Sequence, residues 1–97
     1  MTIRESIILV IKEIIELLSP KTDKDWIILF HKYENIFCNA NAEDISYYCS
    51  DLLQIYGGTG SFNDLVLYND GNVLIDKNKK LNTLREQLFR YLVSIRW

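Results

Sequence analysis

Few side chains in this sequence are of a type that could carry out catalysis. His31 is the only histidine, and the only cysteines are Cys38 and Cys49. A histidine that acts as a general base needs a nucleophile beside it and an acid that orients it. The residues near His31 on its predicted helix include Phe30 and Tyr33, which supply neither. We therefore expect no catalytic residue, and an enzyme that uses His31 or Cys38 is the least favoured class.

Metal, phosphate and calcium sites are also disfavoured by spacing. Cys38 and Cys49 lack the second Cys/His pair of a zinc site. The run Gly57–Ser61 contains three glycines, but a phosphate-binding loop needs a following lysine and links a strand to a helix. The turn 69–72 lacks the acid spacing of a calcium loop. We expect no metal and no cofactor.

Charge is distributed very unevenly along the chain. The total is −2, yet residues 33–76, which we call the acidic segment, contain no Lys or Arg and carry −7. Residues 77–97 carry +5. Two interpretations are open: the two blocks neutralise each other in the folded chain, or part of the acidic segment stays uncompensated and attracts a basic partner. The basic residues form no dense cluster, so we do not expect nucleic-acid binding.

The predicted third helix favours the second interpretation. Its apolar stripe leaves Glu43, Tyr47, Asp51 and Gln54 on the opposite side. An exposed tyrosine among acids is typical of an interface, because Tyr is enriched at binding hot spots. The alternative is a solvated helix face with one stray tyrosine.

The elements that must position these residues follow from apolar spacing. Thr2 and Glu5 form a capping box for a helix that ends before Ser19-Pro20. A second helix starts at Thr22 or Asp23, a third runs over 41–56, a β-hairpin turns at 69–72, and the last helix covers 78–96. We predict a mainly α fold: one domain, 1–97, that resembles a four-helix bundle with a small β-hairpin before the last helix.

Composition agrees with a compact domain. The 97 residues are 48% hydrophobic and 25% charged. The first apolar run is too short for a signal peptide, and a membrane span needs roughly 20 apolar residues. We expect a cytoplasmic protein that does not contact a membrane.

The segment 56–67, which we call the glycine-rich segment, is the most distinctive: its sequence is YGGTGSFNDLVL. It resembles a Gly-Gly-x-Gly-Ser-[Phe/Leu]-Asn-Asp signature found in a family of small bacterial proteins of unknown function. Small acidic bacterial proteins of this kind resemble immunity proteins of toxin–immunity systems, including contact-dependent growth inhibition. The resemblance implies a protein partner, a toxin domain that in many such systems is a basic nuclease. From the residues alone, Ser61 and Asp64 have capping-box spacing, which favours a structural role for the segment.

The function expected from these observations is that of an immunity protein without chemistry of its own, which covers the basic active site of a toxin with an acidic surface. The alternative is a structural or adaptor module that forms homo-oligomers through the Tyr47 face or the tyrosine-rich hairpin. The residues predicted to contact the partner are Glu43, Asp44, Tyr47, Asp51 and Asp64.

Overall fold

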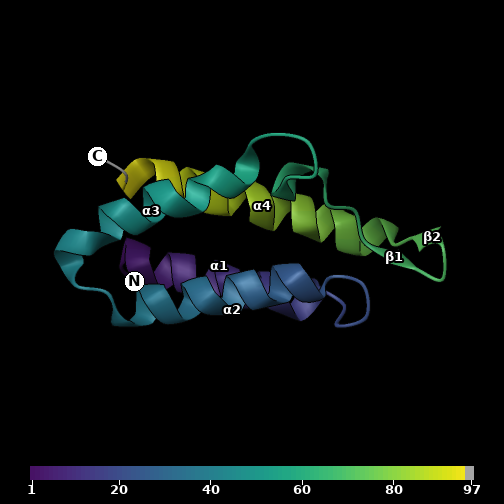
Figure 1. Ribbon diagram of the computed structural model, residues 1–97, viewed down its shortest axis with the longest axis horizontal. Coiled ribbons are helices and arrows are strands. Elements are labelled where there is room, and N and C mark those ends of the chain that lie inside the picture. Colours follow the sequence, from purple (N-terminus) through teal and green to yellow (C-terminus); the bar gives the residue numbers. More distant parts are fainter. Residues whose placement is uncertain (96–97) are drawn as a thin grey trace.

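Four helices and one short hairpin make up the computed structural model, which describes residues 1–95 (Figure 1). The prediction of a mainly α fold with a hairpin before the last helix is confirmed. The predicted helix end at Arg96 lies outside the described residues. The elements are α1 (Ile3–Leu17), α2 (Lys24–Asn39), the 3₁₀ turn η1 (Ala42–Asp44), α3 (Ile45–Leu53), η2 (Gln54–Tyr56), η3 (Phe62–Asp64), β1 (Tyr68–Asn69), β2 (Asn72–Val73) and α4 (Ile75–Ile95).

The first two helices are delimited as the sequence predicts. The backbone N–H of Glu5 donates to the hydroxyl of Thr2 at 3.1 Å, and the Glu5 carboxylate accepts from the Thr2 backbone at 3.4 Å, which completes the capping box. After α1, the buried Asp23 accepts from the backbone N–H of Ser19 at 2.9 Å. This contact closes the turn that contains Pro20 and sets the start of α2.

The helices pack around one apolar core. α1 lies alongside both α2 and α4, and α3 lies along α4, in a body with extents of 44 × 22 × 22 Å (Figure 1). Helical spacing places one apolar stripe of each helix toward this interior. The fully buried large side chains are Phe30, Phe37, Phe62, Ile7, Ile11, Ile14, Leu52, Leu81, Leu88, Leu92 and Cys49.

The predicted third helix is divided into three parts. Residues 42–44 and 54–56 form 3₁₀ turns, and only Ile45–Leu53 is α-helical. Gly57 follows in an extended conformation, while Gly58 and Gly60 have positive φ values of 85° and 74°. Positive φ is accessible to glycine at little cost, so Gly58 and Gly60 reverse the chain here.

The hairpin turn has the predicted geometry. Asp70 and Gly71 both have positive φ, at 51° and 81°, as the centre of a type I′ turn requires. The strands are shorter than expected, with only the pairs Tyr68–Val73 and Asn69–Asn72 in register.

A side chain replaces the missing part of the strand ladder. Asn78 accepts from the Leu67 N–H at 2.8 Å, and its amide donates to the carbonyls of Leu67 at 2.9 Å and Leu74 at 2.8 Å. The Leu67 N–H that a longer strand would have paired is therefore satisfied from α4, while the Leu67 carbonyl also accepts from the backbone N–H of Leu74 at 3.0 Å. The same arrangement explains why α4 begins at Ile75, three residues before the predicted start.

Candidate functional site

The carboxylates of the acidic segment are not paired with the basic residues of α4. Within residues 1–95, ion pairs join Lys12 to Glu34 and Arg90 to Glu86, and the imidazole of His31, which carries a charge only when protonated, also contacts Glu34. Glu34 is thus the one acid of the acidic segment that forms an ion pair in the described part of the chain, and its partners lie on α1 and α2. As far as residue 95, the two charge blocks therefore do not neutralise each other by direct ion pairing.

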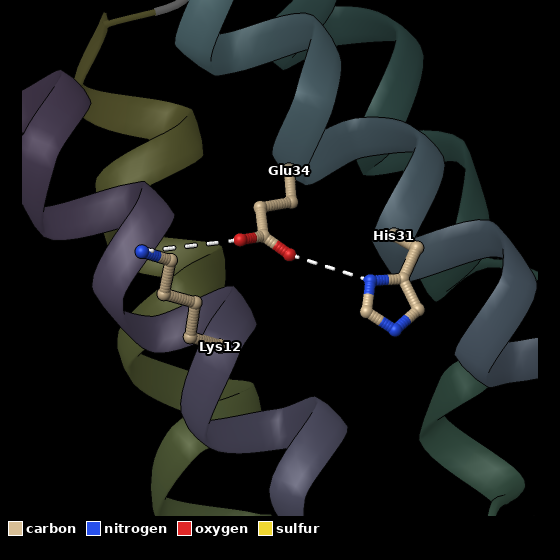
Figure 2. Close-up of polar contacts among 3 residues, drawn as sticks. All are labelled: Lys12, His31 and Glu34. Carbon is tan, nitrogen blue, oxygen red and sulfur yellow. Dashed lines mark ion pairs between the residues drawn. The ribbon is translucent and has the colours of Figure 1, made fainter.

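Glu34 bridges two helices (Figure 2). Its carboxylate lies 3.9 Å from the Lys12 Nζ of α1 and 3.4 Å from the Nδ1 of His31, one turn earlier on α2. The side chain of His31 is 60% exposed. This geometry connects α1 to α2 through charge at the surface, and it gives His31 a structural partner.

The two cysteines differ in accessibility. Cys38 is exposed, whereas Cys49 is fully buried in the core stripe of α3. Burial raises the pKa of the Cys49 thiol to about 11, because the apolar surroundings disfavour the thiolate. Cys49 is therefore an unreactive core residue at neutral pH.

Three of the predicted contact residues lie together at one end of the molecule. Glu43 and Asp44 belong to η1, and Tyr47 follows on the first turn of α3; all three are exposed, Tyr47 by 68%. The Tyr47 ring lies edge-on to Tyr48, with 5.2 Å between ring centres. In Figure 1 this end also holds the start of α1 and the end of α4. We call these three residues the η1 surface.

Asp64 lies elsewhere. It belongs to η3, which packs against η2 beyond the opposite end of α3. Nine helical residues at 1.5 Å each place about 14 Å of α3 between the two positions. The acidic residues therefore form two separate surfaces rather than one stripe.

Asp51 departs from the expected exposed face. Its carboxylate accepts a hydrogen bond from the phenol of Tyr33 on α2, and Tyr33 is only 5% exposed. Asp51 is half-buried. The spacing argument failed here because it considered α3 alone, whereas the side of α3 that carries Asp51 is covered by α2. Asp51 thus connects two helices, and the expectation of a solvated side chain was wrong.

The glycine-rich segment is held to α4 by a residue that the sequence analysis did not select. Arg85 donates to the carbonyls of Asn63 at 2.7 Å and Leu65 at 3.0 Å. Its guanidinium carbon lies 5.1 Å from the centre of the buried Phe62 ring. The sequence did contain a signal for this role, because Arg85 directly follows the core residue Leu84. A residue at that position lies at the edge of the buried stripe of its helix.

Within the segment, Ser61 and Asp64 each cap a turn. The hydroxyl of Ser61 accepts from the backbone N–H of Asn63 at 3.3 Å, and the Asp64 carboxylate accepts from the N–H of Gly60 at 2.8 Å. The expected reciprocal capping box is therefore shifted by one residue. A structural role for most of the segment agrees with these contacts.

Two open cavities flank the segment. The α4 cavity, of about 290 Å³, is lined by Tyr56, Asn63, Asn82, Arg85, Glu86 and Phe89. The hairpin cavity, of about 340 Å³, is lined by Trp26, Gly60, Ser61, Asp64, Leu65, Val66 and Tyr68. The first volume lies just below, and the second at the small end of, the ~300–1,000 Å³ range of ligand pockets.

Two further findings concern residues 1–95. No group of three or more His, Cys, Asp and Glu side chains in that range is arranged to hold a metal ion. None of the described helices combines the length and the apolar character needed to cross a bilayer.

Fold and surface together define a small helical domain with unpaired carboxylates and with two cavities beside one loop. The chain belongs to the family described as a domain of unknown function, DUF6966, whose model matches residues 21–75. The matched range includes α2, α3, the glycine-rich segment and the hairpin. Neither the curated proteins nor the solved structures contain a significant match to this chain.

Proposed function

We propose that this protein is a cytoplasmic immunity protein that binds and neutralises a toxin, a nuclease domain of a contact-dependent growth inhibition system. It acts by covering the basic active site of the toxin with an acidic surface. The observation that carries the proposal is that Glu43, Asp44 and Asp64 form no ion pair within residues 1–95.

Unpaired carboxylates suit a partner of opposite charge. A basic nuclease cleft must hold phosphates, so it offers the complementary potential, and attraction between the two surfaces accelerates association. The η1 surface adds Tyr47, whose exposed ring would be desolvated on contact and would serve as an anchor.

The molecule has enough surface for such a complex. A standard interface buries about 800 Å² on each partner, which is roughly an eighth of the 6225 Å² of accessible surface. The interface would centre on Glu43, Asp44 and Tyr47, with Asp64 at a second contact. Asp51 would contribute by holding α3 against α2, beneath this surface.

The test uses the product of the neighbouring gene, which the proposal expects to carry a nuclease toxin domain, co-expressed with the wild-type chain or with the double variant Glu43→Lys/Asp44→Lys. We expect the wild type to restore growth and to block nuclease activity in vitro. The double variant should associate about tenfold more slowly, with a weaker dependence on salt, because the steering charge is reversed. Glu16→Lys, an exposed reversal on α1, is the control and should associate normally.

The outcomes separate the two parts of the proposal. If the wild type neither binds nor protects, the immunity function is wrong. If protection is complete and the double variant associates at the wild-type rate, the acidic-surface mechanism is wrong.

A second candidate is a structural or adaptor module that forms homo-oligomers. It is favoured by exposed apolar side chains at the hairpin end, among them Tyr68, Val73 and Ile75, which is 67% exposed. Light scattering after size-exclusion chromatography tests it: a dimer that Ile75→Lys converts to a monomer would support this function, and a wild-type monomer at high concentration would exclude it.

A further inference from the structure

The hairpin cavity brings one carboxylate together with two aromatic rings from distant parts of the chain. Trp26 comes from α2, Asp64 from η3 and Tyr68 from β1. Leu65 and Val66 complete the wall between Asp64 and Tyr68 along the chain. A carboxylate beside Trp and Tyr rings is the combination that recognises organic cations, because the ring faces and the carboxylate both attract positive charge.

The aromatic wall is firmly positioned. Trp26 is half-buried and its ring centre lies 5.4 Å from that of Phe62 and 6.2 Å from that of Phe30, both of which are fully buried. The core therefore fixes one side of the cavity, so that side loses little conformational entropy when a ligand binds.

The Asp64 carboxylate is also held in position, and it can still bind a cationic ligand. Its Oδ2 accepts from the backbone N–H of Gly60 at 2.8 Å, which fixes the carboxylate at the cavity. Within residues 1–95 it forms no ion pair. Arg85 interacts electrostatically with Asp64, but its hydrogen bonds go to the carbonyls of Asn63 and Leu65, and it lines the α4 cavity instead. A cation that enters the hairpin cavity would thus find a positioned carboxylate that forms no ion pair within residues 1–95.

We propose that the hairpin cavity receives an arginine side chain of a protein partner, with the guanidinium at Asp64 and the rings of Trp26 and Tyr68. Arginine fits this lining best because its planar guanidinium both stacks on rings and pairs with a carboxylate. Its aliphatic stem would lie against Leu65 and Val66. The inference rests on the proposed function for the nature of the partner, a basic protein, and it names how that partner is recognised.

The extent of the family supports this cavity over its neighbour. All seven lining residues fall within the matched range 21–75. The α4 cavity depends on four residues of α4, between 82 and 89, which lie outside the match. The range that matches the family model therefore contains the whole lining of the hairpin cavity.

The binding test needs no toxin. The probe is N-acetyl-argininamide, titrated into the ¹⁵N-labelled chain, and N-acetyl-citrullinamide is the control ligand because it has nearly the same shape without the charge. We expect saturable shifts of the Gly60, Ser61 and Val66 amides and of the Trp26 indole N–H with the arginine derivative. Equal shifts with both ligands, or arginine shifts that avoid these groups, would overturn the proposal.

Three variants test the chemistry. Asp64→Asn keeps an oxygen that can accept from Gly60 but removes the charge, and should weaken binding of the probe about fivefold. Tyr68→Leu removes the ring at an exposed position and should weaken it about threefold. Asp70→Asn removes an equal charge from the nearby turn, outside the cavity, and should have no effect. Equal affinities for Asp64→Asn and Asp70→Asn would show that only the general charge matters.

This result is independent of the neutralisation assay. If the probe fails to bind and the chain still protects against the toxin, the cavity proposal falls and the immunity function stands. If the probe binds with the expected variant pattern and the chain does not protect, the cavity stands as a cation site and the immunity function falls.

Discussion

The hydrogen bond between Tyr33 and Asp51 should have a large effect on stability. It joins α2 to α3, whose contact is less extensive than those of α1 with α2, α1 with α4, or α3 with α4. Tyr33→Phe removes only the phenol oxygen and leaves the Asp51 carboxylate without its partner. A hydrogen bond to a charged group contributes about 1.5–3 kcal/mol. Because Asp51 is half-buried and water can replace part of the bond, we expect a loss of about 2 kcal/mol.

The assay is urea unfolding at neutral pH, followed by circular dichroism. The midpoint should fall while the m-value stays constant, because the surface exposed on unfolding is the same. In thermal unfolding, each kcal/mol corresponds to roughly 4–8 °C in a domain of this size, so Tm should fall by about 8–16 °C. Asp51→Asn, which keeps an acceptor but loses the charge, should cost less, about 1 kcal/mol.

The matched control is Tyr47→Phe, the same substitution at an exposed position of α3, which should change stability by less than about 0.5 kcal/mol. If Tyr33→Phe is as mild as Tyr47→Phe, the bond does not hold α3 in place. The double variant with Asp51→Asn must also be less destabilised than the sum of the single variants, since both remove the same interaction.

Alkaline pH tests the environment of the same phenol independently. Burial, and then the hydrogen bond and charge of Asp51, raise the pKa of Tyr33 above its ordinary value near 10. A raised pKa of an acid means that the folded state favours the protonated phenol. This contribution is complete below about pH 10 and is lost as the pH rises further. Tyr33→Phe should therefore lose less stability than the wild type between neutral pH and pH 11.

Three other predictions concern the core and the hairpin. At pH 8 the exposed Cys38 should react rapidly with a thiol reagent, whereas Cys49 should react only as fast as the chain unfolds, because burial raises the Cys49 pKa to about 11. Cys38→Ser should abolish the fast phase, and two equally fast phases in the wild type would contradict the prediction. Asn78→Ala should lower the free energy of unfolding by about 1–3 kcal/mol, because the N–H of Leu67 loses its partner while the Leu67 carbonyl keeps only the bond from the Leu74 N–H at 3.0 Å, and unchanged hydrogen exchange at the Leu67 amide would refute the role assigned to Asn78. Tyr56→Phe should also reduce alkaline destabilisation, since burial raises the Tyr56 pKa, as pH-dependent thermal unfolding can measure.

The order and type of the elements could be predicted because they depend on local patterns. The capping box at Thr2, the stop at Pro20 and the turn at Asp70-Gly71 are set by residues a few positions apart. The apolar stripe of α3 was also correct at Ile45, Cys49 and Leu52. Such features need no knowledge of the rest of the chain.

The features that the sequence did not predict depend on contacts between elements that are far apart along the chain. Asp51 faces Tyr33 from 18 residues away, and Arg85 reaches the glycine-rich segment across 20 or more. Neither pairing has a periodic signal in the sequence. Leu65 and Leu67 looked like strand residues because of their type, yet side chains of α4 bind the Leu65 carbonyl and both polar backbone groups of Leu67. The cavity beside Asp64 was missed for the same reason, because Trp26 meets it only after α2 has packed on η3.

The pairing of α1 with α4 has a consequence for synthesis on the ribosome. α1 emerges first, but one of its two main partners is the last helix of the described chain. At about 5–20 residues per second, α1 and α2 wait for several seconds before α4 is free to fold against them. During that interval α1 can bury its apolar stripe against α2 alone, so we expect Ile7, Ile11 and Ile14 to stay partly exposed in the nascent chain.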